Sequence, residues 1–177
     1  AGKISYKDGK LLLDAQPQGV GYMWRQMPAE LRGQHGLRIE AWVQALPMNQ
    51  PGMQGRFYQD ALFLSDGKPQ LYQGDYQYYF LTGQDGTAHQ FNTFGFGQGD
   101  NAGAVKPGRL VHFTIECLGS EFRCKRDNSK LLKVATPGPP FRVSEQLHIG
   151  LMCYASRFAL VQIAYRTLKP APEATLT

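Results

Sequence analysis

The sequence predicts an all-β fold, a two-sheet antiparallel sandwich, on three observations. Short apolar runs alternate with polar residues at a period of two, and no long segment has the 3.6-residue period of a helix. The 177 residues include 20 Gly, 11 Pro, 9 Tyr and 10 Phe, a composition typical of many short strands joined by turns. Asp-Gly pairs recur between apolar runs, and such pairs are frequent hairpin turns.

The first half of the chain divides into short strands. Residues 4–6 and 10–13 flank the turn Lys7-Asp8-Gly9 and form the first expected hairpin. Further strands are expected at residues 22–25, 37–46, 56–64, 77–82 and 89–96, with a loop or one helical turn at 28–36. Residues 94–103 are glycine-rich, and we expect Asp100-Asn101 in a turn. Two oxygen ligands do not complete a calcium shell, so we expect no cofactor, with calcium left as an open alternative.

The second half contains the clearest strand pattern. Residues 110–118, 121–126 and 131–135 form an expected meander with turns at Gly119-Ser120 and 127–129, and residues 147–154 and 158–168 form the last two strands. Cys117 lies opposite Cys124 or one pair away from it, on the apolar face in either register. The two residues form either a cross-strand disulfide or two buried free thiols.

Length and charge limit the organisation of the chain. We expect one domain over residues 1–168 and a C-terminal tail at 169–177, without a membrane span. The net charge of +5 belongs to the second half, where residues 101–177 carry eleven Lys or Arg against five Asp or Glu. Five of these cations crowd the meander, namely Arg123, Lys125, Arg126, Lys130 and Lys133. An anionic partner is one explanation and an exposed solvent face is the stronger one; no motif for nucleic acid is found.

One strand carries an unusual polar face. Leu37, Ile39, Ala41 and Val43 form the apolar face of residues 37–46, while the opposite face carries Arg38, Glu40, Trp42 and Gln44. A face with an arginine, a glutamate, a tryptophan and a glutamine is too polar for a core. It indicates either a binding groove or a tryptophan that covers the edge of a sheet.

The closing strands resemble those of concanavalin A-like (laminin G-like) jelly-roll domains. The phrases that carry the resemblance are Ile149-Gly150-Leu151 and the run from Phe158 to Ile163, and Asp127-Asn128 stands where that superfamily often has Asp-Gly. The first half agrees more loosely. The resemblance covers most of the chain and implies a jelly-roll sandwich. It also implies a secreted or periplasmic protein, because such domains are mostly secreted or periplasmic, and many of them bind or cleave polysaccharides.

A polysaccharide-binding domain is the first functional interpretation, with a groove on one sheet. Sugar rings stack their apolar faces on aromatic side chains, and their hydroxyl groups bond amides, carboxylates and guanidinium groups. Trp24 belongs to the wider aromatic set of the chain. The predicted binding residues are Arg38, Glu40, Trp42, Arg56, Tyr58, Tyr76, Gln77 and Tyr79.

Two alternatives remain open. A glycoside hydrolase or polysaccharide lyase of the same fold would use Glu40, Glu116 and His112, although the compact carboxylate phrase of one hydrolase family and the alginate lyase phrases are absent. The fold also hosts protein-interaction domains, and fold alone does not fix function.

Overall fold

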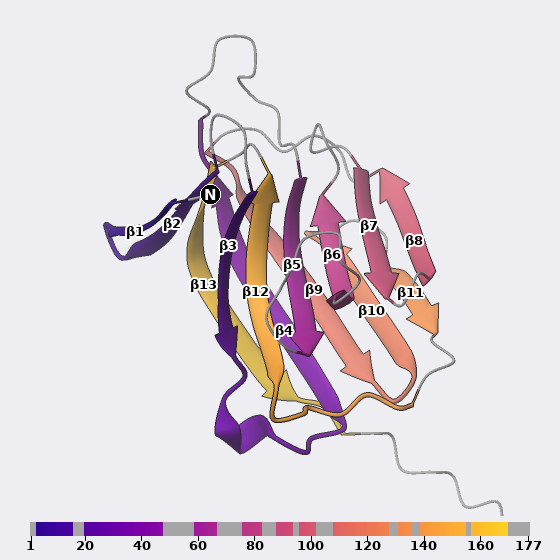
Figure 1. Cartoon of the computed structure of the whole chain (residues 1–177). Coiled ribbons are helices and arrows are strands. Elements are labelled where there is room, and N and C mark those ends of the chain that lie inside the picture. Colours follow the sequence, from indigo (N-terminus) through magenta and orange to yellow (C-terminus); the bar gives the residue numbers. More distant parts are fainter. Residues whose placement is uncertain are drawn as a thin grey trace, which may run out of the picture.

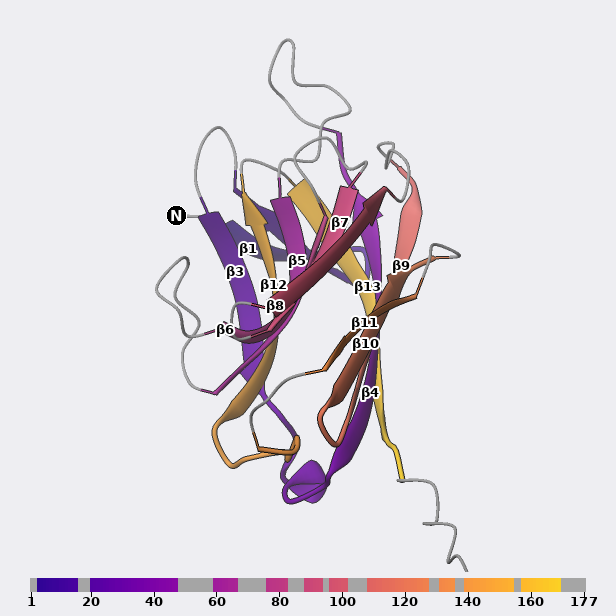
Figure 2. The ribbon, with the colours of Figure 1, turned by 90° about the vertical axis from the view of Figure 1, so that its right-hand side faces the viewer.

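The chain folds into two antiparallel β-sheets that pack face to face. The computed structural model describes residues 3–15, 20–47, 59–66, 76–82, 88–93, 96–101, 108–127, 131–135, 139–154 and 157–169. Within these residues one sheet has seven strands and the other has six. Figure 1 shows the six-stranded sheet in front of the seven-stranded sheet, and Figure 2 shows the two layers edge-on. The predicted all-β sandwich is confirmed.

Neighbouring strands are antiparallel throughout both sheets. The seven-stranded sheet contains, in spatial order, β1 (Lys3–Lys7), β2 (Lys10–Asp14), β13 (Arg157–Thr167), β4 (Gly36–Ala45), β9 (Leu110–Leu118), β10 (Glu121–Arg126) and β11 (Leu132–Ala135). The six-stranded sheet contains β3 (Val20–Gln26), β12 (Leu147–Tyr154), β5 (Gln59–Asp66), β6 (Tyr76–Thr82), β7 (Ala88–Thr93) and β8 (Phe96–Asn101). A short 3-10 turn, η1 (Ala29–Leu31), precedes β4.

The core forms between the inward faces of the two sheets because apolar side chains alternate along the strands. In β4, Ile39 is fully buried, and Ile115 of β9 lies directly opposite it. In the other sheet, Ile149 and Leu151 of β12 pair with Leu64 and Leu62 of β5, and all four belong to one buried cluster. Polar residues at the alternate positions of β4 and β9 therefore point away from the core, onto the outer face of the seven-stranded sheet.

Three expectations about individual segments were wrong. The glycine-rich segment contains β8, in which Asp100 and Asn101 pair with His89 and Ala88 rather than forming a turn. This strand is held by backbone pairing, which needs no side chains. Strand β5 continues through Asp66, two residues beyond the expected end of this strand at residue 64. Arg126, grouped with the solvent-facing cations, is 1% exposed and shares the inward face of β10 with Phe122 and Cys124; burial lowers its pKa.

The three cysteines are buried free thiols. Cys117 pairs with Phe122 and Cys124 pairs with Ile115, so the two cysteines are diagonal neighbours on the inward face. Diagonal positions in an antiparallel pair are roughly 7–8 Å apart, farther than a disulfide normally spans. Desolvation raises the pKa of both thiols, and the nearby charge of Glu116 adds to the effect at Cys117. Of the two alternatives, the structure has the free thiols.

Thiol labelling checks this arrangement. We expect the folded protein to react very slowly with a thiol reagent at pH 8, because Cys117, Cys124 and Cys153 are each at most 1% exposed and the thiolate is the reactive form. In the unfolded protein without reductant, all three thiols should react with the reagent. A single reactive thiol in the unfolded, unreduced protein would instead indicate a Cys117–Cys124 bond.

Candidate functional site

The candidate site lies on the outer face of the seven-stranded sheet, on β4 and β9. Because Leu37, Ile39 and Ala41 of β4 are fully buried, the alternate residues Arg38, Glu40, Trp42 and Gln44 point outward and are partly exposed. Their partners on β9 are Glu116, Thr114, His112 and Leu110, in that order. The polar face expected for residues 37–46 is therefore present, and β9 completes it.

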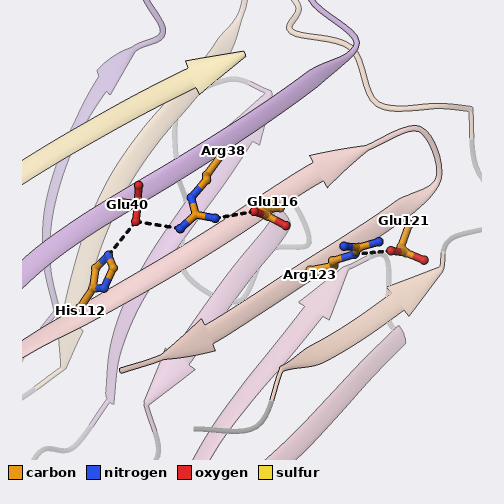
Figure 3. A network of polar contacts seen from close by, with 6 residues as sticks. All are labelled: Arg38, Glu40, His112, Glu116, Glu121 and Arg123. Carbon is orange, nitrogen blue, oxygen red and sulfur yellow. Dashed lines mark hydrogen bonds and ion pairs between the residues drawn. The ribbon is translucent and has the colours of Figure 1, made fainter. Parts of the chain in front are cut away.

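Arg38 joins two carboxylates on neighbouring strands. Its Nη1 donates to Glu116 Oε1 at 2.7 Å, and its Nη2 donates to Glu40 Oε1 at 3.0 Å. Figure 3 shows the guanidinium group between the two carboxylates. The hydrogen bond from Arg38 holds the pKa of Glu40 below its ordinary value, and the two carboxylates together raise the pKa of Arg38.

His112 extends this network toward Trp42. His112 Nε2 lies 3.1 Å from Glu40 Oε1, although it is not aligned for a hydrogen bond. The imidazole stacks on the indole of Trp42, with ring centroids 4.4 Å apart and planes 7° apart. The backbone of His112 is held by Asp127, whose Oδ1 accepts from the His112 N–H at 2.9 Å and whose N–H donates to the His112 carbonyl at 2.7 Å.

Within this cluster, Glu40 suits hydrogen bonding better than acid catalysis. Three polar atoms of these side chains, Arg38 Nε, His112 Nε2 and Thr114 Oγ1, are buried and have no hydrogen-bond partner among the described residues. Thr114 is 5% exposed even though it lies on the outer face, since longer side chains surround it. A general acid needs a raised pKa, whereas Arg38 lowers that of Glu40. Glu40 is therefore suited to accept hydrogen bonds as an ionised carboxylate.

The structure brings together only some of the predicted site residues. Arg38, Glu40 and Trp42, together with His112 and Glu116, form one cluster on β4 and β9. Tyr76, Gln77 and Tyr79 belong to β6, which lies in the six-stranded sheet on the other side of the core. Arg56 and Tyr58 lie outside the described residues. The eight predicted binding residues thus do not all belong to one sheet.

Other residues on this face were not predicted as site residues. Gln162 and Arg166 of β13 lie opposite Trp42 and Arg38, and Thr114 lies opposite Glu40. Alternation within each strand indicates which side a residue faces. Alternation does not indicate which strands are neighbours, so no pattern in the sequence could predict that β13 pairs with β4.

A second exposed tryptophan lies on the opposite side of the molecule. Trp24 of β3 is 43% exposed and makes an edge contact with His148 of β12, with ring centroids 5.0 Å apart. Because β3 and β12 are neighbours in the six-stranded sheet, Trp24 and Trp42 face away from each other across the core. This pair of residues offers a natural comparison between the two faces.

Two further features concern metals and membranes. Among the residues with described side chains, no three His, Cys, Asp or Glu lie close enough to hold a metal ion together. No helix within the described part of the chain is long and apolar enough to cross a membrane.

Comparison with known proteins shows the fold. No family model matches the chain, and no curated protein sequence matches it. Among solved structures, the exoplasmic/lumenal domain of VIP36 in a Ca2+/Man3GlcNAc-bound form aligns with a TM-score of 0.69 and 8% identity, over 98% of this chain and 85% of that chain. The Emp46p carbohydrate recognition domain, a point mutant, aligns with a TM-score of 0.67 and 11% identity, over 93% and 85%.

A bacterial module is also similar. The carbohydrate binding module CBM66 from Bacillus subtilis aligns with a TM-score of 0.61 and 10% identity, over 94% of this chain and 92% of that chain. Because these identities are low, the likeness shows the fold alone. The chain has the jelly-roll sandwich of these carbohydrate recognition domains, as the resemblance of its closing strands implied.

Proposed function

We propose that this chain is a polysaccharide-binding domain and that it binds through the outer face of its seven-stranded sheet. The observation that carries the proposal is the cluster of Arg38, Glu40, Glu116 and His112 with the stacked Trp42. It combines charged donors and acceptors with an aromatic ring on one partly exposed surface. Sugars are recognised by this combination, because their rings have apolar faces and hydroxyl rims.

The cluster is held in place before a ligand arrives. Arg38 is fixed by two carboxylates on two strands, and His112 is fixed through its ring by Trp42 and through its backbone by Asp127. Side chains that are already ordered lose less conformational entropy when they bind. Since His112 covers one face of the Trp42 indole, a sugar would contact the other face or the exposed edge.

The similar structures support this proposal. They include a carbohydrate recognition domain, a carbohydrate binding module and a form bound to Man3GlcNAc. VIP36 is represented by its exoplasmic/lumenal domain, which supports a location outside the cytosol for this chain as well. The narrower likeness to laminin G-like domains stays a prediction. Some of the similar structures contain Ca2+ or potassium.

Paired tryptophan variants test which face binds. We expect Trp42→Ala to weaken retention on the glycan that the wild type binds by up to about tenfold, since stacking on an aromatic ring is worth ~0.5–1.5 kcal/mol. Trp24→Ala is the matched control, because Trp24 is the more exposed tryptophan and lies on the other sheet. The measurement is affinity electrophoresis against a panel of neutral and anionic polysaccharides, with thermal denaturation to confirm that both variants fold.

Testing the same mixtures of protein and polysaccharide for released products separates the binding domain from the alternative functions. Release of reducing ends or unsaturated products that disappears in Glu40→Gln or Glu116→Gln would replace the binding domain with an enzyme. Loss of retention in Trp24→Ala but not in Trp42→Ala would move the site to the six-stranded sheet. If no glycan is retained and no products appear, the proposal fails and a protein-interaction domain becomes the better interpretation.

A further inference from the structure

Four cations from four strands stand in one row on the outer face. Directly opposed residues in antiparallel strands share a face. Arg166 of β13 lies opposite Arg38 of β4, Arg38 lies opposite Glu116 of β9, and Glu116 lies opposite Arg123 of β10. Arg123 in turn lies opposite Lys133 of β11. The row, which we call the cationic row, consists of Arg166, Arg38, Glu116, Arg123 and Lys133.

The cationic row contains two pairs of like charges. Arg166 opposes Arg38, and Arg123 opposes Lys133, an arrangement that destabilises an antiparallel sheet. Glu40 and Glu116 bind Arg38, and Glu121 pairs with Arg123. Lys125 lies beside the row, opposite Thr114. These five cations face three carboxylates, so the surface keeps a positive excess.

Two cations of this surface make no ion pair with another described residue. Arg166 is exposed, Lys125 is partly exposed, and neither makes an ion pair with another described residue. Charges that only kept the sheet soluble would gain from alternating in sign along a row. A row of opposed like charges gains its largest stabilisation when an anion binds across it.

We propose that the ligand of this face is an anionic polysaccharide, with carboxylate or sulfate groups, lying across the strands along the cationic row. This inference rests on the proposed glycan-binding function. From β13 to β11 the row crosses four strand spacings of ~4.8 Å, about 19 Å in all. The spacing is of the order of one sugar ring, so acidic groups of an extended chain can meet the arginines and the lysine of the row while its hydroxyl groups meet Glu116.

The carboxylates within the surface favour a glycan over a nucleic acid. Glu40 and Glu116 can accept hydrogen bonds from sugar hydroxyl groups while the arginines and lysines bind the acidic groups. A DNA backbone carries phosphates but no hydroxyl groups within the strand, so it offers these two carboxylates no hydrogen-bond donor to offset the repulsion. Nucleic acid binding is therefore the competing outcome of the test rather than part of the proposal.

Two charge-matched double variants test the inference. Arg166→Gln/Lys125→Gln removes two cations at or beside the row, and Arg32→Gln/Arg142→Gln removes two exposed cations from loop segments outside both sheets. The probes are polygalacturonate and dextran sulfate as anionic glycans, unmodified dextran and mannan as neutral glycans, and a short DNA duplex. We expect the wild type to prefer an anionic glycan, and the first double variant to bind it about tenfold more weakly. The loop variant should stay within about twofold of the wild type.

The outcomes separate the inference from the proposed function. Retention of neutral glycans alone, unchanged in the first double variant, would overturn the anionic ligand and leave the glycan-binding function intact. Anionic binding that is equal in both double variants would overturn the assignment to the cationic row. A DNA duplex that competes as strongly as the anionic glycan would show a general preference for polyanions and overturn the inference. Absence of retention on every glycan would overturn both. Equal thermal midpoints would confirm that the variants remain folded.

Discussion

Replacing Arg38 with Gln is expected to lower the free energy of unfolding by about 2–3 kcal/mol at pH 7. Arg38 is 24% exposed and donates to two carboxylates on adjacent strands, so its ion pairs are stronger than ordinary surface pairs. The variant leaves Glu40 and Glu116 close together without their shared cation. Urea denaturation of both proteins at the same pH gives the difference.

The pH dependence of this difference identifies its cause. Arg38 depresses the pKa of Glu40 below its ordinary 4.5, so the stabilisation is fully present above pH 4.5 and is lost as the pH falls through the lowered value. The advantage of the wild type over Arg38→Gln should therefore shrink between pH 7 and about pH 3. A difference that is the same at both pH values would contradict the electrostatic explanation.

Arg25→Gln is the matched control for Arg38→Gln. Arg25 is exposed on β3, and no ion pair joins it to another described residue. We expect its replacement to change the free energy of unfolding by less than about 0.5 kcal/mol at either pH. A loss similar to that of Arg38→Gln would show that any arginine on the sheets has this effect, and the network on β4 and β9 would lose its special role.

Replacing Phe122 with Ala is expected to cost about 3–5 kcal/mol of stability, the largest effect among these variants. Phe122 is fully buried on the inward face of β10. It makes an edge contact with Phe141, at a centroid distance of 6.1 Å and an interplanar angle of 83°. The Phe141 backbone N–H donates to the Gly119 carbonyl oxygen at 2.8 Å. Residues 139–146, the crossing segment between β11 and β12, are therefore held to β10 by the Phe122 ring as well, and the substitution removes that ring contact.

A surface leucine gives the comparison for Phe122→Ala. Leu131 is 41% exposed just before β11, and Leu131→Ala should cost less than about 0.5 kcal/mol. Urea denaturation measures both variants at pH 7. A cost below about 1 kcal/mol for Phe122→Ala would mean that the core between β10 and the crossing segment is not packed as described. If the variant fails to fold, Phe122→Leu should still show a measurable loss.

Patterns within single segments were sufficient for most of the strands. Strand β12 covers Leu147–Tyr154, as its apolar run predicted, and β4 differs from the predicted range by one residue at each end. The hairpin turn was also predicted: Asp8 and Gly9 both have positive φ, which Asp-Gly turns accommodate readily. The glycine-rich β8 was missed because pairing with β7, rather than any side-chain pattern, makes it a strand.

The all-β class, most strand positions and the outward direction of Arg38, Glu40 and Trp42 could be predicted from the sequence, because alternation is a property of each strand alone. The neighbours of these three residues depend on the tertiary structure. It placed Glu116 and His112 of β9 on one side of β4 and Arg166 of β13 on the other, and it placed β6 in the other sheet. These relations depend on pairing between segments far apart in the chain, and that pairing is set by burial of all the inward faces at once rather than by any local pattern.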